Sequence, residues 1–128
     1  MKKTIVKPTR SPQAIGPYNQ AVKTDHLIYT AGQIPIDPKT NQLITGDITA
    51  QARQVLSNLK NLIEESGSSL DKVVKCTVFL KNMNDFAAMN AVYAEYFKAE
   101  TAPARSTIEV ARIPKDALIE IEAVALAR

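Results

Sequence analysis

The residues best suited to chemistry lie in the last quarter of the chain, where two alternating segments follow one another. In residues 104–112, Arg105 lies on the more polar face, and in residues 117–125 Glu120 and Glu122 lie opposite the apolar positions. We expect the two segments to form a β-hairpin that presents the arginine and the glutamates on one face. A guanidinium matches a carboxylate in shape and charge, and a nearby glutamate can orient water. The pattern therefore predicts a site for a small carboxylic acid that reacts with water.

A structural interpretation of the same residues stands beside this one. Cross-strand pairs of arginine and glutamate are ordinary on exposed sheet faces, and Glu120 could simply pair with Arg112 or Lys115. Periodicity also does not choose between Glu120 and Glu122, because they share a face. From the alternation alone, the structural interpretation is the more common outcome.

Length and composition indicate one globular domain spanning residues 1–128. The chain has a hydrophobic content of 45%, a charged content of 23% and a net charge of +3, which together argue against disorder. Its basic residues are scattered and form no nucleic-acid-binding signature, so we expect a small anionic molecule rather than nucleic acid as partner. No stretch reaches the length of a membrane helix, and a single cysteine fits a reducing compartment. We expect a cytoplasmic protein without membrane association.

Periodicity predicts two amphipathic helices, at residues 48–65 and 85–98. Asp47 or Thr49 can cap the first helix, which Gly67 would close, and Asn84 or Asp85 can cap the second. Strands are predicted at residues 4–6, 27–31, 73–80, 104–112 and 117–125. The fold class is therefore α+β, with a mixed β-sheet that carries two helices on one face. The opposite face, which includes Val73, Thr77, Phe79 and Val124, is too apolar for water, and we expect it to meet another subunit.

Metal and cofactor sites are not indicated by the sequence. His26 is the single histidine and precedes a predicted strand, where it fits a turn, while Cys76 alternates with Val74, Val78 and Leu80 and fits the core. The chain carries neither a phosphate-binding loop nor a dinucleotide fingerprint. We therefore predict no metal and no cofactor.

Several short motifs run the length of the chain. They are Ala14-Ile15-Gly16-Pro17-Tyr18, Gly32-Gln33-Ile34-Pro35, Gln51-Ala52-Arg53-Gln54, Asn84-Asp85-Phe86-Ala87 with Asn90, Pro103-Ala104-Arg105-Ser106, Glu109-Val110-Ala111-Arg112-Ile113-Pro114-Lys115-Asp116 and Ile119-Glu120-Ile121-Glu122-Ala123. The Pro-Ala-Arg-Ser block followed by Val-Ala-Arg-x-Pro-Lys-Asp is the most specific of them. Together these motifs resemble those of the reactive-intermediate deaminase family, RidA, formerly YjgF.

The resemblance implies a fold similar to bacterial chorismate mutase, assembled as a homotrimer with clefts between subunits. It also implies hydrolytic deamination of 2-imino acids, formed from enamines such as 2-aminoacrylate, to 2-keto acids and ammonia. Arg105 would then hold the substrate carboxylate and Glu120 would position and polarise water.

The resemblance further places Tyr18, Gly32, Asn90 and Thr107 in the substrate-binding cleft. Each has an alternative that the sequence leaves open. Tyr18 could serve loop packing, Gly32 could only permit a turn, and Asn90 needs a polar partner that is either backbone or ligand. For Thr107 we expect the backbone N–H, rather than the side chain, to contribute.

Two positions depart from the usual family pattern. Ala31 stands where many members carry serine, and Thr107 stands where many carry cysteine. Imine hydrolysis needs no covalent intermediate, so we expect the reaction to survive the missing thiol. The alternative functions are a regulatory or chaperone-like module that binds a keto acid in the same cleft, and the ribonuclease-type activity credited to some family members.

Overall fold

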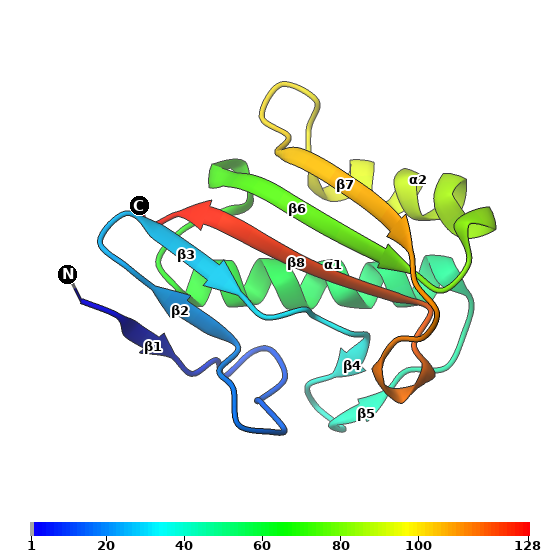
Figure 1. The fold of residues 1–128 in the computed structure, drawn as a ribbon, viewed down its shortest axis with the longest axis horizontal. Coiled ribbons are helices and arrows are strands. Elements are labelled where there is room, and N and C mark those ends of the chain that lie inside the picture. The colour runs from blue at the N-terminus through cyan, green and yellow to red at the C-terminus, as the bar shows by residue number, and fades with distance from the viewer. Residues whose placement is uncertain (1) are drawn as a thin grey trace.

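The fold is a six-stranded mixed sheet with both α-helices on one of its faces (Figure 1). A computed structural model describes residues 2–128. The strands of the main sheet are β1 (Thr4–Val6), β2 (Ala21–Lys23), β3 (Leu27–Thr30), β8 (Ile119–Leu126), β6 (Val73–Leu80) and β7 (Ala104–Glu109), in spatial order. A small hairpin of β4 (Ile36–Asp37) and β5 (Gln42–Leu43) and three 3-10 turns, Leu70–Lys72, Met83–Asp85 and Pro114–Asp116, complete the elements. The predicted α+β class is confirmed.

The first helix, α1, spans Ile48–Glu65, as its periodicity predicts. The Asp47 side chain accepts a hydrogen bond from the Ala50 N–H at 3.0 Å, which satisfies one of the free donors of the first turn. Gly67, with φ of +91°, lets the chain leave the helix in the left-handed region. The apolar stripe of α1 is buried against the sheet.

The second helix, α2, spans Phe86–Tyr96 and is shorter at both ends than the predicted 85–98. A 3-10 turn precedes it, in which the Asn82 side chain accepts a hydrogen bond from the Asn84 N–H at 2.9 Å. Asp85 occupies the N-cap position but makes no side-chain capping bond. After Phe97 the chain turns away from the sheet and forms the loop that projects between α2 and β7 (Figure 1).

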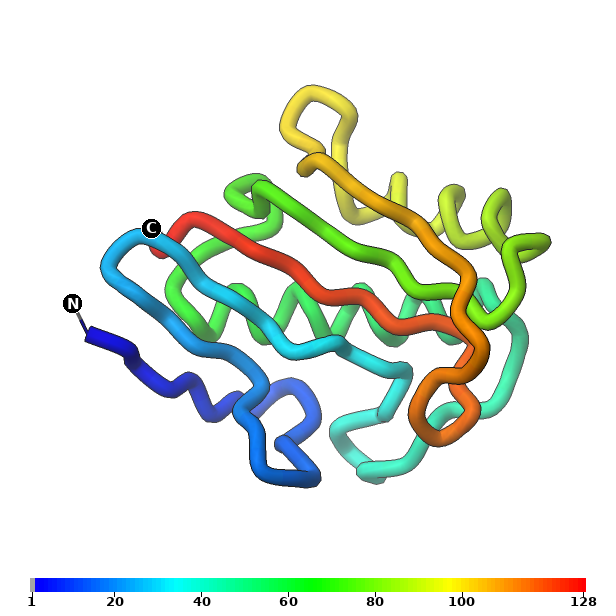
Figure 2. Tube along the Cα trace, in the orientation of Figure 1, coloured from blue at the N-terminus to red at the C-terminus, as the bar shows by residue number. Residues whose placement is uncertain are grey.

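The predicted hairpin of the last two strands is wrong. Strand β7 pairs in parallel with β6, and β8 pairs antiparallel with both β6 and β3, so β6 lies between β7 and β8. The segment β6–α2–β7 is therefore a crossover unit whose helix connects two parallel strands. Figure 2 shows this path, together with the antiparallel meander of β1, β2 and β3 at the other edge.

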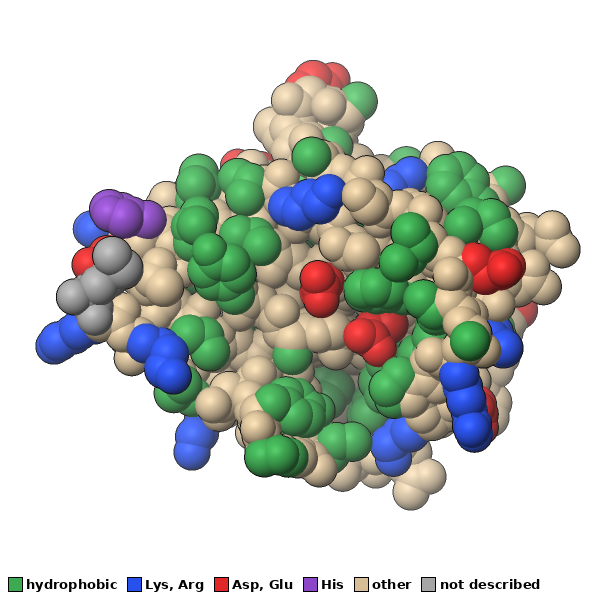
Figure 3. Space-filling model, in the orientation of Figure 1, with side chains coloured by type: hydrophobic (Ala, Val, Ile, Leu, Met, Phe, Trp, Pro, Cys, Tyr) green, Lys and Arg blue, Asp and Glu red, His purple; other side chains and the backbone are tan. Residues whose placement is uncertain are grey.

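The two faces of the sheet differ sharply in burial. The face under the helices carries the core positions of the long strands, which are Cys76, Val78, Leu80, Ile119, Ile121, Ala123 and Ala125. The opposite, open face carries Ile5, Val22, Tyr29, Lys75, Thr77, Phe79, Ser106, Ile108, Glu120, Glu122, Val124 and Leu126. Figure 3 views the open face and shows apolar side chains gathered over one part of the sheet and acidic side chains over its middle.

A β-bulge in β6 reverses the predicted orientation of Val73 and Val74. The register shifts between Val73 and Lys75, so Val73 is buried and Val74 is exposed, the reverse of the predicted positions. The rest of the predicted open-face set, Thr77, Phe79 and Val124, lies on that face. Strand β2 and the β4–β5 hairpin were not predicted, because their short sequences carry little periodicity.

No helix within residues 2–128 combines the length and the apolar character that crossing a bilayer requires.

One buried polar side chain ties α1 to the segment that follows Gly32. The Asn58 amide is fully buried and donates to the carbonyls of Ile36 at 2.8 Å and Ile34 at 3.3 Å, while its oxygen accepts from Gln54 at 3.0 Å. The Ile34 carbonyl also accepts from the Ile36 N–H at 2.7 Å, so Asn58 adds a second bond there and a buried bond at Ile36. Asn58 therefore fixes the path of the chain just beyond the candidate site.

We predict that Asn58→Ala lowers the free energy of unfolding by about 1–3 kcal/mol, because the buried hydrogen bonds of its amide are lost. Lys60→Ala, an exposed change on the same helix, should stay within about 0.5 kcal/mol of the parent. Urea denaturation followed by circular dichroism measures both. Equal midpoints for the two variants would show that the amide does not stabilise this segment.

Candidate active site

The guanidinium of Arg105 is held in place by three side chains of α2. Its Nη1 donates to Asn90 Oδ1 at 2.7 Å, and its central carbon lies 4.5 Å from the centre of the Tyr93 ring and 5.6 Å from that of Phe86. Stacking on aromatic rings and one hydrogen bond fix the plane of the group while its other N–H donors stay available. Arg105 is therefore prepared to bind a carboxylate.

The sequence explains how these three side chains meet Arg105. Phe86, Asn90 and Tyr93 are spaced four and three residues apart, which places them on one face of α2. Asn90 was expected to bind backbone or ligand, and in the structure it binds Arg105 instead. The contribution of Phe86 and Tyr93 was not predicted from the sequence. A polar residue flanked by aromatic residues at helical spacing was the available signal.

Beneath Arg105 lies a buried pair of weakly acidic groups. Burial raises the pKa of the Cys76 thiol to about 11, so the thiol stays protonated and is a poor nucleophile. Burial also raises the pKa of the Tyr93 phenol, next to this thiol and to Arg105. Within residues 2–128 the Tyr93 hydroxyl has no hydrogen-bond partner. The core position predicted for Cys76 is confirmed.

Glu120 lies directly over Gly32, on the open face of the sheet. A Cβ on Gly32 would overlap the Glu120 carboxylate, so glycine leaves room for the conformation that this side chain adopts. Backbone hydrogen bonds between Gln33 and Ile121, of 2.8 and 3.1 Å, hold the Gly32 segment against β8. Glycine at position 32 therefore makes room for the Glu120 side chain, which is a different role from permitting a turn.

The carboxyl group of Glu120 has a raised pKa. The main cause is burial, which disfavours the charged form, and the second is repulsion from Glu122 two residues along the same face. The structural alternative of pairing with Arg112 or Lys115 is not found, because Arg112 binds Asp116 at 2.9 Å. Within residues 2–128, none of the ion pairs includes Glu120. A carboxyl group with these properties is suited to exchange protons with water.

Thr107 lies two residues after Arg105 on the same face of β7. The Val110 N–H donates to the Leu80 carbonyl of β6 at 2.9 Å. Strand β7 is an edge strand of the described sheet, with β6 on one side and no strand on the other. Since backbone groups alternate in direction along a strand, the N–H groups of Arg105 and Thr107 point to the free edge. The edge thus offers backbone donors beside the guanidinium.

Tyr18 lies in the loop that precedes β2, with 45% of its surface exposed. Its hydroxyl accepts from the Ile15 N–H at 3.4 Å, and its ring borders a hollow of about 250 Å³ built from residues 6–20. Arg105 does not line this hollow. In a single chain Tyr18 is therefore part of the N-terminal loop rather than of the Arg105 site.

The two main candidates do not meet within one chain. Arg105 pairs in register with Cys76 and faces the helices, whereas Glu120 pairs with Phe79 and faces away from them. The expectation that they share one face, which rested on the wrong hairpin, is itself wrong. One chain therefore holds two separate groups of candidate residues, Arg105 with Asn90 on one side of the sheet and Glu120 with Gly32 on the other.

Within residues 2–128, no three His, Cys, Asp or Glu side chains gather closely enough to hold a metal ion.

The chain matches the family model described as Endoribonuclease L-PSP over residues 8–127. It is 50% identical over 130 residues to the 2-iminobutanoate/2-iminopropanoate deaminase of Escherichia coli K12, with full coverage of both proteins. The structure of the yeast protein YEO7 superposes with a TM-score of 0.95 at 44% identity, covering 99% of this chain and 100% of that one. The E. coli protein TdcF with bound serine superposes with a TM-score of 0.90 at 43% identity, covering 96% and 98%. The chain belongs to the RidA/YjgF family, which the Endoribonuclease L-PSP family model covers.

Proposed function

We propose that this protein hydrolyses reactive 2-imino acids, such as 2-iminopropanoate and 2-iminobutanoate, to the 2-keto acid and ammonia. The observation that carries the proposal is the Arg105 guanidinium, fixed by Asn90 and two aromatic rings with N–H donors left free. Such a group suits a small carboxylate. The full-length relative named 2-iminobutanoate/2-iminopropanoate deaminase supports the same reaction.

The assembly that we propose is a homotrimer with a cleft between each pair of subunits. The open face of the sheet carries large apolar side chains, among them Tyr29, Ile108 and Leu126, which are 48%, 44% and 43% exposed. Their exposure favours burial against another copy. A second copy would also bring its Glu120 to the Arg105 of the first, since no single chain joins them.

In this cleft Arg105 binds the substrate carboxylate, assisted by the Thr107 backbone N–H at the edge of β7. The neighbouring Glu120 takes a proton from a water molecule as the water oxygen bonds to the imine carbon. The resulting carbinolamine carries oxygen and nitrogen on one carbon. The imine enters protonated on nitrogen, so the C=N electron pair moves to nitrogen and the carbinolamine is neutral. Glu120 returns the proton to nitrogen, the C–N bond breaks with its electron pair leaving on ammonia, and Glu120 takes the hydroxyl proton as the carbonyl forms. The proposed reaction requires neither an oxidant nor a covalent enzyme intermediate.

The remaining site residues support this arrangement. Gly32 leaves space for the Glu120 carboxylate, Asn90 orients Arg105, and Tyr18 forms a wall of the cleft. Ala31 and Thr107 stand where many family members carry serine and cysteine. Those differences concern side chains, whereas the proposed reaction uses the backbone N–H of Thr107. The single cysteine, buried and free, fits a cytoplasmic setting.

We predict that light scattering coupled to size exclusion gives about three times the chain mass, because three copies close a ring that covers the open face. A monomer at micromolar concentration would contradict both the trimer and the shared cleft.

We predict that Arg105→Ala and Glu120→Gln each abolish hydrolysis, and that mixing them restores part of it. The assay generates the imine with an amino-acid oxidase and follows its trapping by semicarbazide. Glu120→Gln should still bind a keto acid, because its Arg105 is intact, and Arg105→Lys should be poor because lysine lacks the planar fork. Trimers refolded from an equal mixture should recover about one quarter of parental activity, the share of clefts with both intact residues.

The control for the mixture is each variant refolded alone, which should stay inactive. If the mixture also stays inactive while forming trimers, Arg105 and Glu120 do not act across a subunit boundary. Normal turnover by Glu120→Gln would instead place water activation on another group, with Glu122 the first to be tested.

We predict that Glu122→Gln extends activity to lower pH. Ionised Glu120 is the base, so kcat/KM falls as the pH drops through its raised pKa. Removing the Glu122 charge removes one of the two causes of that shift and moves the acid limb down. Glu100→Gln, a neutralised glutamate in the exposed loop after α2, is the matched control and should leave the profile in place. If the acid limb of the Glu122→Gln profile stays where it is in the parent, that limb does not report the ionisation of Glu120.

A further inference from the structure

A segment without helix or strand, residues 7–20, connects β1 to β2 (Figure 2). We name its residues 8–13 the N-terminal strap. Pro8, Ser11 and Pro12 of the strap are buried, while Thr9 and Arg10 between them are exposed. The N-terminal strap therefore packs against the fold, although it joins none of the strand pairs found in residues 2–128. Its backbone polar groups need other partners.

Those partners come from the C-terminal end of α1. The Glu65 carboxylate accepts hydrogen bonds from the Thr9 N–H at 3.1 and 3.0 Å, from the Arg10 N–H at 3.3 Å and from the Thr9 hydroxyl. One turn earlier, the Asn61 side chain donates to the Arg10 carbonyl at 3.1 Å. Two side chains on one face of the helix thus hold three backbone groups of the N-terminal strap.

The position of Glu65 is unfavourable for the helix itself. Glu65 is the last residue of α1, where the helix dipole disfavours a negative charge. Burial also opposes the ionised form, but hydrogen bonds from Thr9 and Arg10 and the charge of Arg10 outweigh burial, so the pKa of the Glu65 carboxyl lies below its usual value. The contacts that favour the Glu65 charge are therefore those with the N-terminal strap.

The N-terminal strap continues directly into the loop that carries Tyr18. The Gln13 side chain donates back to the Pro8 carbonyl, the Tyr18 N–H donates to the Gly16 carbonyl at 2.8 Å, and the Tyr18 hydroxyl accepts from the Ile15 N–H at 3.4 Å. Residues of the strap and of the loop also line one hollow of about 250 Å³. A shift of the strap is therefore transmitted to Tyr18.

We propose that Glu65 is a positioning residue, which holds the N-terminal strap against α1 and thereby sets the position of Tyr18. This inference rests on the proposed function, in which Tyr18 forms a wall of the cleft, and it adds a residue at the end of α1. The role requires a carboxylate, because both oxygens of Glu65 accept from N–H donors of the strap. An amide at this position would place a donor against those donors.

Trypsin provides a measurement that does not depend on activity. The Arg10–Ser11 bond lies within the N-terminal strap, so its cleavage under native conditions reports local opening of the strap. Glu65→Gln should accelerate this cleavage at least about tenfold, because charged hydrogen bonds to the backbone are lost. Mass spectrometry identifies the product 11–128. Asn61→Ala removes the bond to the Arg10 carbonyl and should accelerate the same cleavage, which keeps the test independent of the folding of Glu65→Gln.

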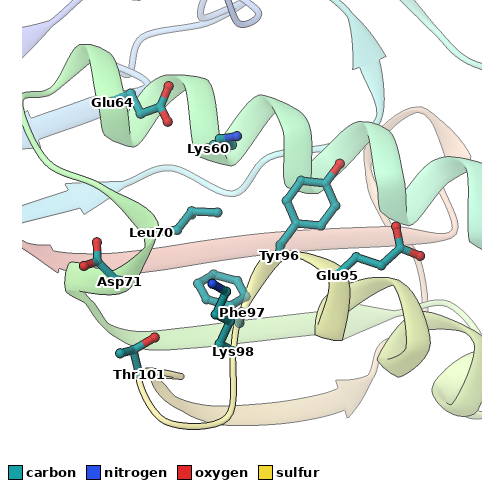
Figure 4. A pocket seen from close by; sticks show the side chains of 9 residues that line it. All are labelled: Lys60, Glu64, Leu70, Asp71, Glu95, Tyr96, Phe97, Lys98 and Thr101. Atoms are coloured by element: carbon teal, nitrogen blue, oxygen red, sulfur yellow. The ribbon is translucent and has the colours of Figure 1, made fainter.

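Glu64→Gln is the matched control, since it makes the same change one residue earlier. Glu64 borders a hollow of about 450 Å³ between α1 and α2, as Figure 4 shows. Its contact with the N-terminal strap is an ion pair of 3.7 Å with the exposed side chain of Arg10. Exposed ion pairs contribute little, so cleavage after Arg10 should stay within about twofold of the parental rate.

Kinetics separate a positioning role from a loss of folded protein. In the semicarbazide assay, Glu65→Gln should raise KM for the alanine-derived imine at least about threefold while kcat stays within about twofold, because a displaced cleft wall weakens substrate binding. Partial unfolding would instead lower kcat at an unchanged KM. Tyr18→Ala should raise KM by itself, and adding Glu65→Gln to it should change KM no further, because Glu65 acts through Tyr18.

The outcomes distinguish the two proposals. Equal cleavage of the Arg10–Ser11 bond in Glu65→Gln and in the parent would overturn the role of Glu65 in holding the strap. Faster cleavage with an unchanged KM, or additive effects in the double variant, would overturn the positioning of Tyr18. Failure of the parent to hydrolyse the imine would overturn the proposed function, and the trypsin comparison would still decide whether Glu65 holds the strap.

Discussion

Successive side chains of a strand point to opposite faces of a sheet, and this constraint determines how the site of this protein is built. Ile119 and Ile121 are fully buried under the helices, so Glu120 between them must face away. Arg105 pairs with buried Cys76, so it must face the helices. A slip of one residue in β8 would bury a carboxylate and expose core isoleucines. The hydrophobic core thus separates Arg105 from Glu120, and the proposed reaction therefore depends on a second surface.

The environment that raises the Glu120 pKa also affects the stability of the folded protein. The folded protein binds the carboxyl proton more tightly than the unfolded chain does, because burial and Glu122 raise the Glu120 pKa. Stability from this group is therefore lost as the pH rises from the ordinary glutamate range through the raised pKa. The steric fit over Gly32 keeps the carboxyl group in this environment. A group that retains its proton unusually well is also one that can return it to a leaving nitrogen.

Local patterns predicted single elements well and their partners poorly. The bounds of α1 follow from a long apolar stripe between the Asp47 cap and Gly67, both of which act within a few residues. Alternation likewise placed Glu120 and Glu122 together on one face. It could not reveal that β6 inserts between β7 and β8, because strand order depends on contacts far apart in sequence. The spacing of a strand, helix α2 and another strand was the sign of a parallel crossover.

The candidate residues show the same division. Strand alternation singled out Arg105 and left Glu120 and Glu122 open, and motif resemblance then selected Glu120 and added Gly32. The structure shows what surrounds two of these residues, through the aromatic contacts of Arg105 and the steric fit over Gly32. The roles of Phe86 and Tyr93 were missed, since a helical stripe reports burial and not which side chain is packed against it. The resemblance named the residues, while the contacts that hold them come from tertiary structure.

Two incomplete surfaces of the chain complement each other in the proposed trimer. The free edge of β7 carries unpaired backbone donors beside Arg105, a feature that proteins usually cover because it promotes association. The open face carries exposed Tyr29 and Ile108 around the half-buried Glu120. A head-to-tail contact that places the edge of one copy against the open face of the next would cover both surfaces. Rotation by a third of a turn closes such contacts into a ring, so the packing that protects the sheet would also create each cleft.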